Sequence, residues 1–116
     1  MKTIQIKRIY DDPSESDGYR ILVDRIWPRG VSKEEAKLDE WNKDLAPSTE
    51  LRKWFDHDPD KFEDFSKEYK KELEYNKDEL KALHDMAKSK TVTLLYGAKD
   101  VKYNQAVVLK EVLDDI

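Results

Sequence analysis

A short charged segment directly after an apolar run is the part of this chain best suited to chemistry. The apolar run 21–23 is followed within six residues by Asp24, Arg25 and Arg29. A proline and a glycine in the same stretch make the backbone turn there. A carboxylate can act as a general base, and guanidinium groups bind phosphate or carboxylate through paired donors. Because α/β proteins build sites where strands end, this segment predicts a binding site.

A second polar group follows a second apolar run near the end of the chain. Thr91–Leu95 predicts a buried strand, and Tyr96, Lys99 and Asp100 come directly after it. If the two strands are parallel, both polar groups lie at the same edge of the sheet. A final helix is predicted to begin near Val101, with Asp100 as its N-cap. Its free N–H groups would then attract anions to that edge.

The sequence therefore predicts a cleft for a small anion, phosphate or nucleotide-like, at the carboxyl edge of the sheet. Arg52 either completes this cleft or pairs with Asp56 four residues later, and both alternatives stay open. The neighbours Asp24 and Arg25 have a purely structural alternative too, as ends of a salt bridge that ties strand to loop. The predicted ligand-binding residues are Arg25, Arg29, Arg52, Tyr96, Lys99, Asp100 and Asn104, and the catalytic candidate is Asp24.

Three classes of function fit these residues. The first is a binding module for a small phosphorylated ligand or nucleotide. The second is a hydrolase or transferase acting on a phosphorylated or nucleic-acid substrate, with Asp24 as the base, although no nucleophile or metal set accompanies it. The third is a protein-interaction module that uses exposed aromatic residues such as Trp41 or Trp54. We rank them in that order.

The composition excludes several other classes. A net charge of −4 leaves no general basic surface, so duplex DNA is not expected as a partner. The chain has no cysteine, which rules out thiolate chemistry, and His57 and His84 have no companion ligands at a metal-binding spacing. We therefore expect no metal and no cofactor. Without an apolar leader or a membrane-length apolar run, we expect a cytoplasmic protein; the oligomeric state stays open.

Three apolar patterns predict the strands that must position the site. Thr3–Ile9 alternates and predicts a half-buried strand, whereas Tyr19–Ile26 is apolar enough to be buried on both faces. Thr91–Leu95 is the third predicted strand. The long helical connection between the second and third strands favours a parallel pair. The first connection has about nine residues, which is short for a parallel crossover and long for a hairpin, so the relative direction of the first two strands stays open.

Helix-start signals divide the rest of the chain. Ser32 and Glu35 form a capping box, and Ser48 and Asp58 are typical N-caps. The segment Leu38–Trp41 is expected to be irregular. Amphipathic stripes predict helices over about 62–73, 76–87 and 101–113. We therefore predict an α/β fold in a single domain, 1–116, with a small three-stranded, mostly parallel sheet packed with about four to five helices.

Three blocks of the sequence resemble a known family. Residues 19–30 (YRILVDRIWPRG), 45–55 (LAPSTELRKWF) and 91–109 (TVTLLYGAKDVKYNQAVVL) are similar to the short, YeaO-like branch of the uncharacterised domain of unknown function 488 family. The resemblance covers nearly the whole chain. It implies no established activity.

Longer members of the wider family carry a strand that ends in Asp-x-Arg followed by Pro, and later a Cys-His-Arg at a helix start. Asp24 and Pro28 resemble the first block, with Arg25 adjacent to the aspartate. Asn104-Gln105-Ala106 occupies the second block, and the short branch often has Asn-His there. The resemblance thus implies that any thiol-based mechanism of the long forms is excluded here. It also implies that both blocks fall at the carboxyl edge of the sheet.

Overall fold

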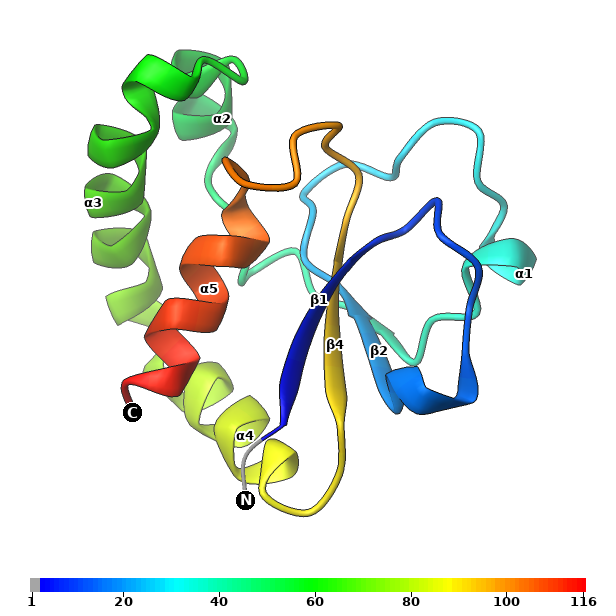
Figure 1. The fold of residues 1–116 in the computed structure, drawn as a ribbon. Coiled ribbons are helices and arrows are strands. Elements are labelled where there is room, and N and C mark those ends of the chain that lie inside the picture. The colour runs from blue at the N-terminus through cyan, green and yellow to red at the C-terminus, as the bar shows by residue number, and fades with distance from the viewer. Residues whose placement is uncertain (1–2) are drawn as a thin grey trace.

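The computed structural model describes residues 3–116, so the first two residues of the predicted domain, Met1 and Lys2, lie outside the described part. One parallel sheet runs through the molecule (Figure 1), with the strand order β1-β4-β2-β3. The strands are β1 (Ile4–Arg8), β2 (Tyr19–Leu22), β3 (Glu40–Trp41) and β4 (Val92–Tyr96).

Helices connect the strands and cover the sheet. Within residues 3–116 they are α1 (Lys33–Ala36), α2 (Thr49–Phe55), α3 (Phe62–Leu73), α4 (Lys77–Ala87) and α5 (Gln105–Asp114), with short 3-10 turns η1 (Glu15–Asp17), η2 (Pro59–Lys61) and η3 (Glu74–Asn76). The predicted α/β class, the parallel sheet and the number of helices are confirmed. The predicted count of three strands is wrong, because β3 forms a fourth. That strand has two residues, too few to show a periodic pattern in the sequence.

Strand β4 is the centre of the sheet, and all five of its residues are buried. It pairs in parallel with β1 on one side and with β2 on the other, so that Val92 lies opposite both Ile4 and Tyr19. The connection from β1 to β2 is therefore a parallel crossover. The relative direction of these two strands was left open by the sequence. β2 ends at Leu22, earlier than the predicted Ile26, because the chain turns away after Val23 donates its N–H to Leu95.

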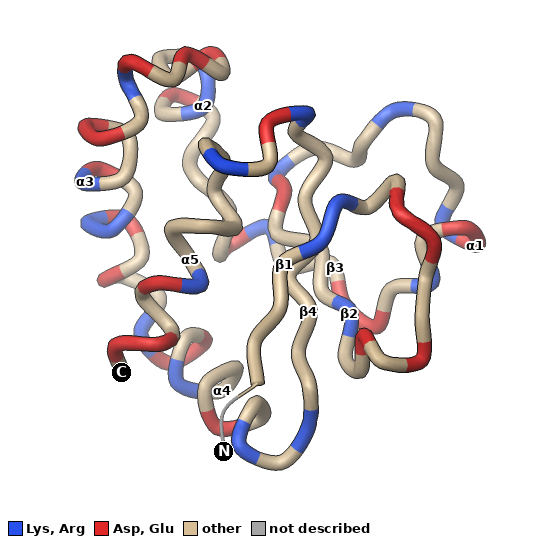
Figure 2. Tube along the Cα trace, viewed as in Figure 1, with Lys and Arg blue, Asp and Glu red and all other residues tan. Residues whose placement is uncertain are grey.

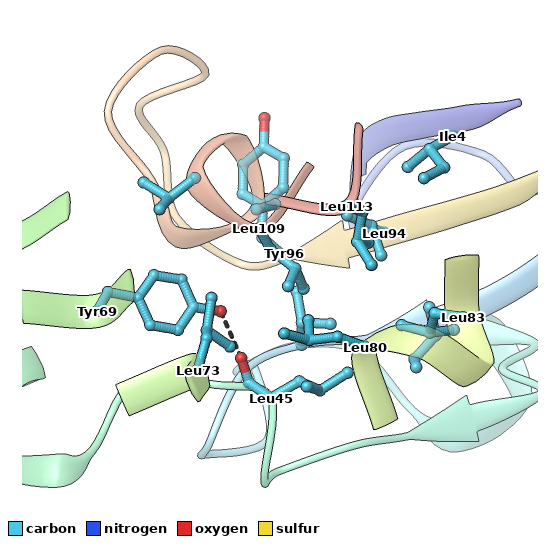
Figure 3. Close-up of a cluster of buried hydrophobic side chains, with 14 of the residues drawn as sticks. Ile4, Leu45, Tyr69, Leu73, Leu80, Leu83, Leu94, Tyr96, Leu109 and Leu113 are labelled. Carbon is cyan, nitrogen blue, oxygen red and sulfur yellow. Dashed lines mark hydrogen bonds between the residues drawn. The ribbon is translucent and has the colours of Figure 1, made fainter. Parts of the chain in front are cut away.

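The main core lies between the sheet and helices α2 to α5. Figure 1 shows α3, α4 and α5 together on one side of the sheet and α1 on the other. The close-up in Figure 3 shows Leu73, Leu94 and Leu109 gathered in this core, where the buried Tyr69 hydroxyl donates a hydrogen bond to the backbone carbonyl of Leu45. This bond ties α3 to the segment that precedes α2.

The opposite face of the sheet carries a smaller core. Leu22 and Leu95 are fully buried there, and Trp27 and Trp41 pack against them. The two indole rings meet edge to face, with centroids 5.2 Å apart. Trp41 is thus mostly occupied in packing, which reduces the area available to the protein-interaction alternative.

The three side-chain caps predicted at Ser32, Ser48 and Asp58 are present, at the starts of α1, α2 and η2. The Ser32 hydroxyl accepts the Glu35 N–H at 3.0 Å while the Glu35 carboxylate accepts the Ser32 N–H at 3.1 Å. Ser48 caps α2 through the Leu51 N–H, and Asp58 caps η2 through the Asp60 N–H.

The start of the last helix differs from the prediction. α5 begins at Gln105, and its N-cap is Asn104, whose side-chain oxygen accepts the Val107 N–H at 3.1 Å. Asp100 instead accepts the N–H groups of Lys102 and Tyr103, at 2.8 and 3.1 Å. This local turn holds the backbone in a non-helical path for four residues, so the helix starts later than Val101.

A buried ion pair joins the second strand to its surroundings. The Arg20 guanidinium donates to the Asp17 carboxylate and to the Ala36 carbonyl, and Lys7 donates to Asp17 at 3.2 Å. Arg20 is 4% exposed and Asp17 is 3% exposed. Burial alone would raise the pKa of Asp17, but the hydrogen bonds from the Ser14 N–H, Lys7 and Arg20 outweigh it and lower that pKa. Arg20 therefore serves the fold.

Most other charges lie on solvated helix faces. Figure 2 shows both acidic and basic residues along α3. Pairs such as Lys67 with Glu63, whose charged atoms are 3.8 Å apart, are largely exposed and contribute little to stability. No helix within residues 3–116 has both the length and the apolar character needed to cross a membrane.

Candidate functional site

Asp24 connects the ends of β2 and β4. One carboxylate oxygen accepts the Gly97 N–H at 2.9 Å, and the other accepts a hydrogen bond from the Gln105 side-chain amide. The backbone carbonyl of Asp24 accepts the indole N–H of Trp41 at 2.7 Å. The predicted meeting of the two polar loops is therefore observed. Parallel pairing of β2 with β4 brings their carboxyl ends to one edge, and the first residue of α5 lies against them.

A small hollow of about 50 Å³ lies beside Asp24. Phe55 and Phe65 form part of its apolar wall, with ring centroids 4.2 Å apart in a stacked arrangement. Among the described residues, the polar side chains that line it include Asp24, Arg25, Arg52, Asn104 and Gln105. The hollow thus combines two guanidinium groups, one carboxylate and two amides.

The two arginines of this hollow are held differently. Arg25 donates to the backbone carbonyls of Pro47 and Ala46, at 2.9 and 3.1 Å, which fixes its guanidinium group without neutralising it. Arg52 comes from the last turn of α2 and is half-buried. Within residues 3–116, no carboxylate oxygen lies within 4.0 Å of either guanidinium group. Neither the predicted alternative pair of Arg52 with Asp56 nor a bridge between Asp24 and Arg25 is formed.

The surroundings of Asp24 change its ionisation. Burial raises the pKa of this carboxyl from its ordinary 3.8 to about 6, while the Gly97 N–H, the charge of Arg52 and the Gln105 amide act in the opposite direction. Asp24 is therefore ionised at neutral pH and becomes neutral in mildly acidic solution. The net positive charge around the hollow increases by one when that happens.

Four of the eight predicted site residues line the hollow: Asp24, Arg25, Arg52 and Asn104. The side chain of Asn104 is used in capping α5 and in a 2.9 Å bond to the Asp100 carbonyl. The other four predicted residues lie elsewhere: Arg29 and Lys99 are exposed, Tyr96 is buried in the core, and Asp100 makes the turn before α5.

Three further polar side chains at the hollow are absent from the predicted site. Gln105 contacts Asp24, and its position directly after a helix cap is a signal that could have found it. His57 and Tyr103 also line the hollow. No local pattern points to them, because each comes from a turn whose position is fixed only by tertiary packing.

The chemistry available to this arrangement is limited. The part of the chain that the structure describes contains no group of three or more His, Asp or Glu side chains able to hold a metal ion. Both carboxylate oxygens of Asp24 are already engaged as acceptors. Guanidinium groups without carboxylate partners are suited to binding an anion.

The fold and the site together define a small α/β protein with a parallel sheet and a polar hollow at the carboxyl edge of that sheet. The chain belongs to the domain of unknown function 488 family, because residues 3–116 match the family model described as the inactive DUF488-N3 subclade. The family resemblance inferred from the three sequence blocks is thereby confirmed.

Curated relatives support the same assignment. The chain is 50% identical to the uncharacterised protein YeaO of Escherichia coli K12 over 108 residues, which cover 93% of this chain and 94% of that protein. It is 37% identical over 111 residues to an uncharacterised protein of Mycobacterium tuberculosis H37Rv and to one of Mycobacterium bovis, with 96% of this chain and 93% of each relative covered. No solved structure matches the chain significantly.

Proposed function

We propose that this protein binds a small anion in the hollow beside Asp24. The observation that carries the proposal is the pair Arg25 and Arg52, whose guanidinium groups line one hollow without a carboxylate partner within 4.0 Å in residues 3–116. Ionised Asp24 lies on the same lining and interacts with the charge of Arg52, so it offsets one of the two positive charges and the other stays uncompensated. Half-buried charge without compensation is costly, and an anion that accepts hydrogen bonds from both guanidinium groups would neutralise it.

The size of the hollow limits the bound group. Sites for whole small molecules typically span roughly 300–1,000 Å³, whereas this hollow has about 50 Å³. A single phosphoryl, sulfate or carboxylate group is the size that fits. The nucleotide-like ligand considered from the sequence would therefore place only its phosphate inside.

Binding rather than turnover is the function we propose. Each carboxylate oxygen of Asp24 already accepts one hydrogen bond, from Gly97 or from Gln105, and these bonds hold the carboxylate between the two loops. The chain also belongs to a subclade described as inactive. We assign Asp24 the role of holding the two loops together and tuning the charge of the hollow.

Isothermal titration calorimetry with inorganic phosphate and with sulfate tests the proposal. We expect saturable binding in the wild type and a loss of about 10- to 100-fold in affinity for Arg52→Ala, equivalent to about 1.5–3 kcal/mol for charge-assisted hydrogen bonds. Arg52→Lys should recover part of that loss, because it restores the charge without the planar fork.

Lys53→Ala is the matched control for the same titration. Lys53 follows Arg52 on α2, is exposed and carries the same charge, but it does not line the hollow. Its removal should leave anion affinity nearly unchanged. Absence of heat in the wild type at millimolar anion, or equal losses in Arg52→Ala and Lys53→Ala, would refute the proposal.

A further inference from the structure

We infer that the ligand is a phosphate monoester bearing a planar ring, with the phosphoryl group in the hollow and the ring stacked at its mouth against His57 and Tyr103. This inference rests on the proposed function and deepens it. The chemistry it names is shared by nucleoside monophosphates and by aryl phosphates.

The size of the hollow places the rest of any ligand outside. The hollow has about 50 Å³, which leaves room for a single phosphoryl group, so the substituent on the ester oxygen must leave through the opening. Two aromatic side chains from separate segments line the hollow and are also exposed to solvent. His57 comes from the turn between α2 and η2, and Tyr103, which is 39% exposed, comes from the loop before α5.

The backbone at His57 has an unusual conformation. Asp56 and His57 are consecutive residues with left-handed backbone angles, φ 45° and 55°, in a region that few residues other than glycine adopt. Asp56 is the C-cap of α2, whereas His57 is not a helix cap. Non-glycine residues in this conformation cost free energy, and they occur often at ligand sites. The imidazole ring lies 6.4 Å from the ring of Phe55, centroid to centroid.

The Tyr103 ring is held by a different contact. It meets the half-buried Phe62 edge to face, with centroids 5.1 Å apart and planes at 65°. Its backbone N–H is bonded to Asp100. Rings that are already positioned lose little conformational entropy on binding, so stacking energy is available to hold a ligand. Aromatic stacking is also tolerant of which planar ring is bound.

A comparison of four ligands tests the inference: inorganic phosphate, ribose 5-phosphate, phenyl phosphate and adenosine 5′-monophosphate. We expect at least one of the two ring-bearing esters to bind about tenfold more tightly than ribose 5-phosphate. Which of them gains affinity distinguishes a nucleoside from a simple aryl group. Tight binding of either supports the inference.

Variants then identify the side chains that cause the gain in affinity for the ring-bearing ester. His57→Ala and Tyr103→Ala should each lower the affinity for the ring-bearing ester several-fold more than the affinity for inorganic phosphate, while Tyr103→Phe should retain the preference for the ring-bearing ester. Tyr75→Ala, which removes an aromatic side chain that is 91% exposed on η3, is the control and should alter nothing.

The inference and the proposed function fail in different ways. Equal affinity for ribose 5-phosphate and both ring-bearing esters overturns the inference, and the proposed function stands if inorganic phosphate still binds through Arg52. Absence of binding by all four ligands overturns both. A ring preference that survives His57→Ala and Tyr103→Ala together also overturns the inference, because the ring would then bind elsewhere.

Discussion

The carboxylate of Asp24 accepts the backbone N–H of Gly97 at 2.9 Å, although 73 residues separate them in the sequence. This bond joins the loop after β2 to the loop after β4. The close approach of Asp24 and Pro28 to residue 97 also explains why that residue is glycine. A Cβ atom at that position would lie 3.0 Å from the Asp24 carboxylate and 3.2 Å from the ring of Pro28.

Gly97→Ala should therefore destabilise the protein. We expect a loss of about 1–3 kcal/mol in the free energy of unfolding, since Pro28 is buried and has little room to move. Urea denaturation followed by tryptophan fluorescence measures the loss. Gly30→Asn is the control for the steric effect: a new Cβ at residue 30 meets nothing within 4 Å, and the positive φ of residue 30, 79°, which residue 97 does not share, is one that Asn adopts more readily than most residues. Equal losses in the two variants would contradict the steric explanation.

The stability of the fold should depend on the ionisation of Asp24. Its pKa is about 6 in the fold and near its ordinary 3.8 in the unfolded chain, so the folded state binds the proton more tightly. This carboxyl thus stabilises the fold fully below about pH 3.8, and its contribution is lost as the pH rises through 6. A shift of this size corresponds to up to about 3 kcal/mol.

Asp24→Asn isolates that contribution. The amide oxygen can still accept the Gly97 N–H, and the Gln105 amide can rotate to accept a hydrogen bond. We expect the stability difference between variant and wild type to grow in favour of the variant between pH 4 and pH 7. Denaturation curves across that range provide the measurement. A difference that stays constant with pH would show that Asp24 titrates normally.

The affinity of the hollow for anions should also depend on whether Asp24 is protonated. Sulfate keeps its charge between pH 5 and 8, so any change in its affinity reports the protein. We expect sulfate to bind about tenfold more tightly as the pH falls through about 6, because neutralising Asp24 removes a negative charge from the hollow. Calorimetric titration at several pH values measures the change.

Two variants test whether Asp24 causes this change. Asp24→Asn should bind sulfate tightly at all these pH values, whereas His57→Gln, which changes another side chain on the same lining, should keep the step near pH 6. A step that survives in Asp24→Asn would remove Asp24 from the explanation.

Removing the acidic partner of Arg20 should be more harmful than any surface change. Asp17→Asn leaves a buried guanidinium group without its counter-charge, and we expect a loss of about 3–5 kcal/mol. Because the pKa of Asp17 is lowered in the fold, its contribution is present above the ordinary 3.8 and is lost as the pH falls through the folded value. Chemical denaturation at pH 7 measures the loss.

The exposed pair of Glu63 and Lys67 provides the comparison for Asp17. Glu63→Gln removes one charge from a pair whose side chains are 86% and 66% exposed. Its effect on the free energy of unfolding should stay below about 0.5 kcal/mol. Similar losses in Glu63→Gln and Asp17→Asn would indicate that burial does not strengthen the Arg20 pair.

Patterns that are complete within a few residues could be predicted from the sequence. The buried run at Thr91–Leu95 specifies the central strand, and the hydroxyls of Ser32 and Ser48 specify two helix starts. The parallel sheet followed from the long helical connection, since such crossovers join parallel strands. These features needed no knowledge of distant contacts.

Features that depend on tertiary contacts were missed. Asp100 and Asn104 are equally good N-caps by type, and only the turn that Asp100 forms with Lys102 decides between them. Likewise Arg25 and Arg29 are indistinguishable in the sequence. Arg25 lines the hollow because the carbonyl of Pro47, 22 residues away, fixes its guanidinium group, while Arg29 is exposed.

The contact between Asp24 and Gln105 spans 81 residues and has a consequence for synthesis. A ribosome makes Asp24 and Arg25 early, then Arg52, and Gln105 only much later. The emerging chain therefore carries separated charges with no enclosure around them until α5 has left the exit tunnel. An anion cannot act as a template for the early stages of folding, and it can stabilise only a chain that has been made at least as far as α5.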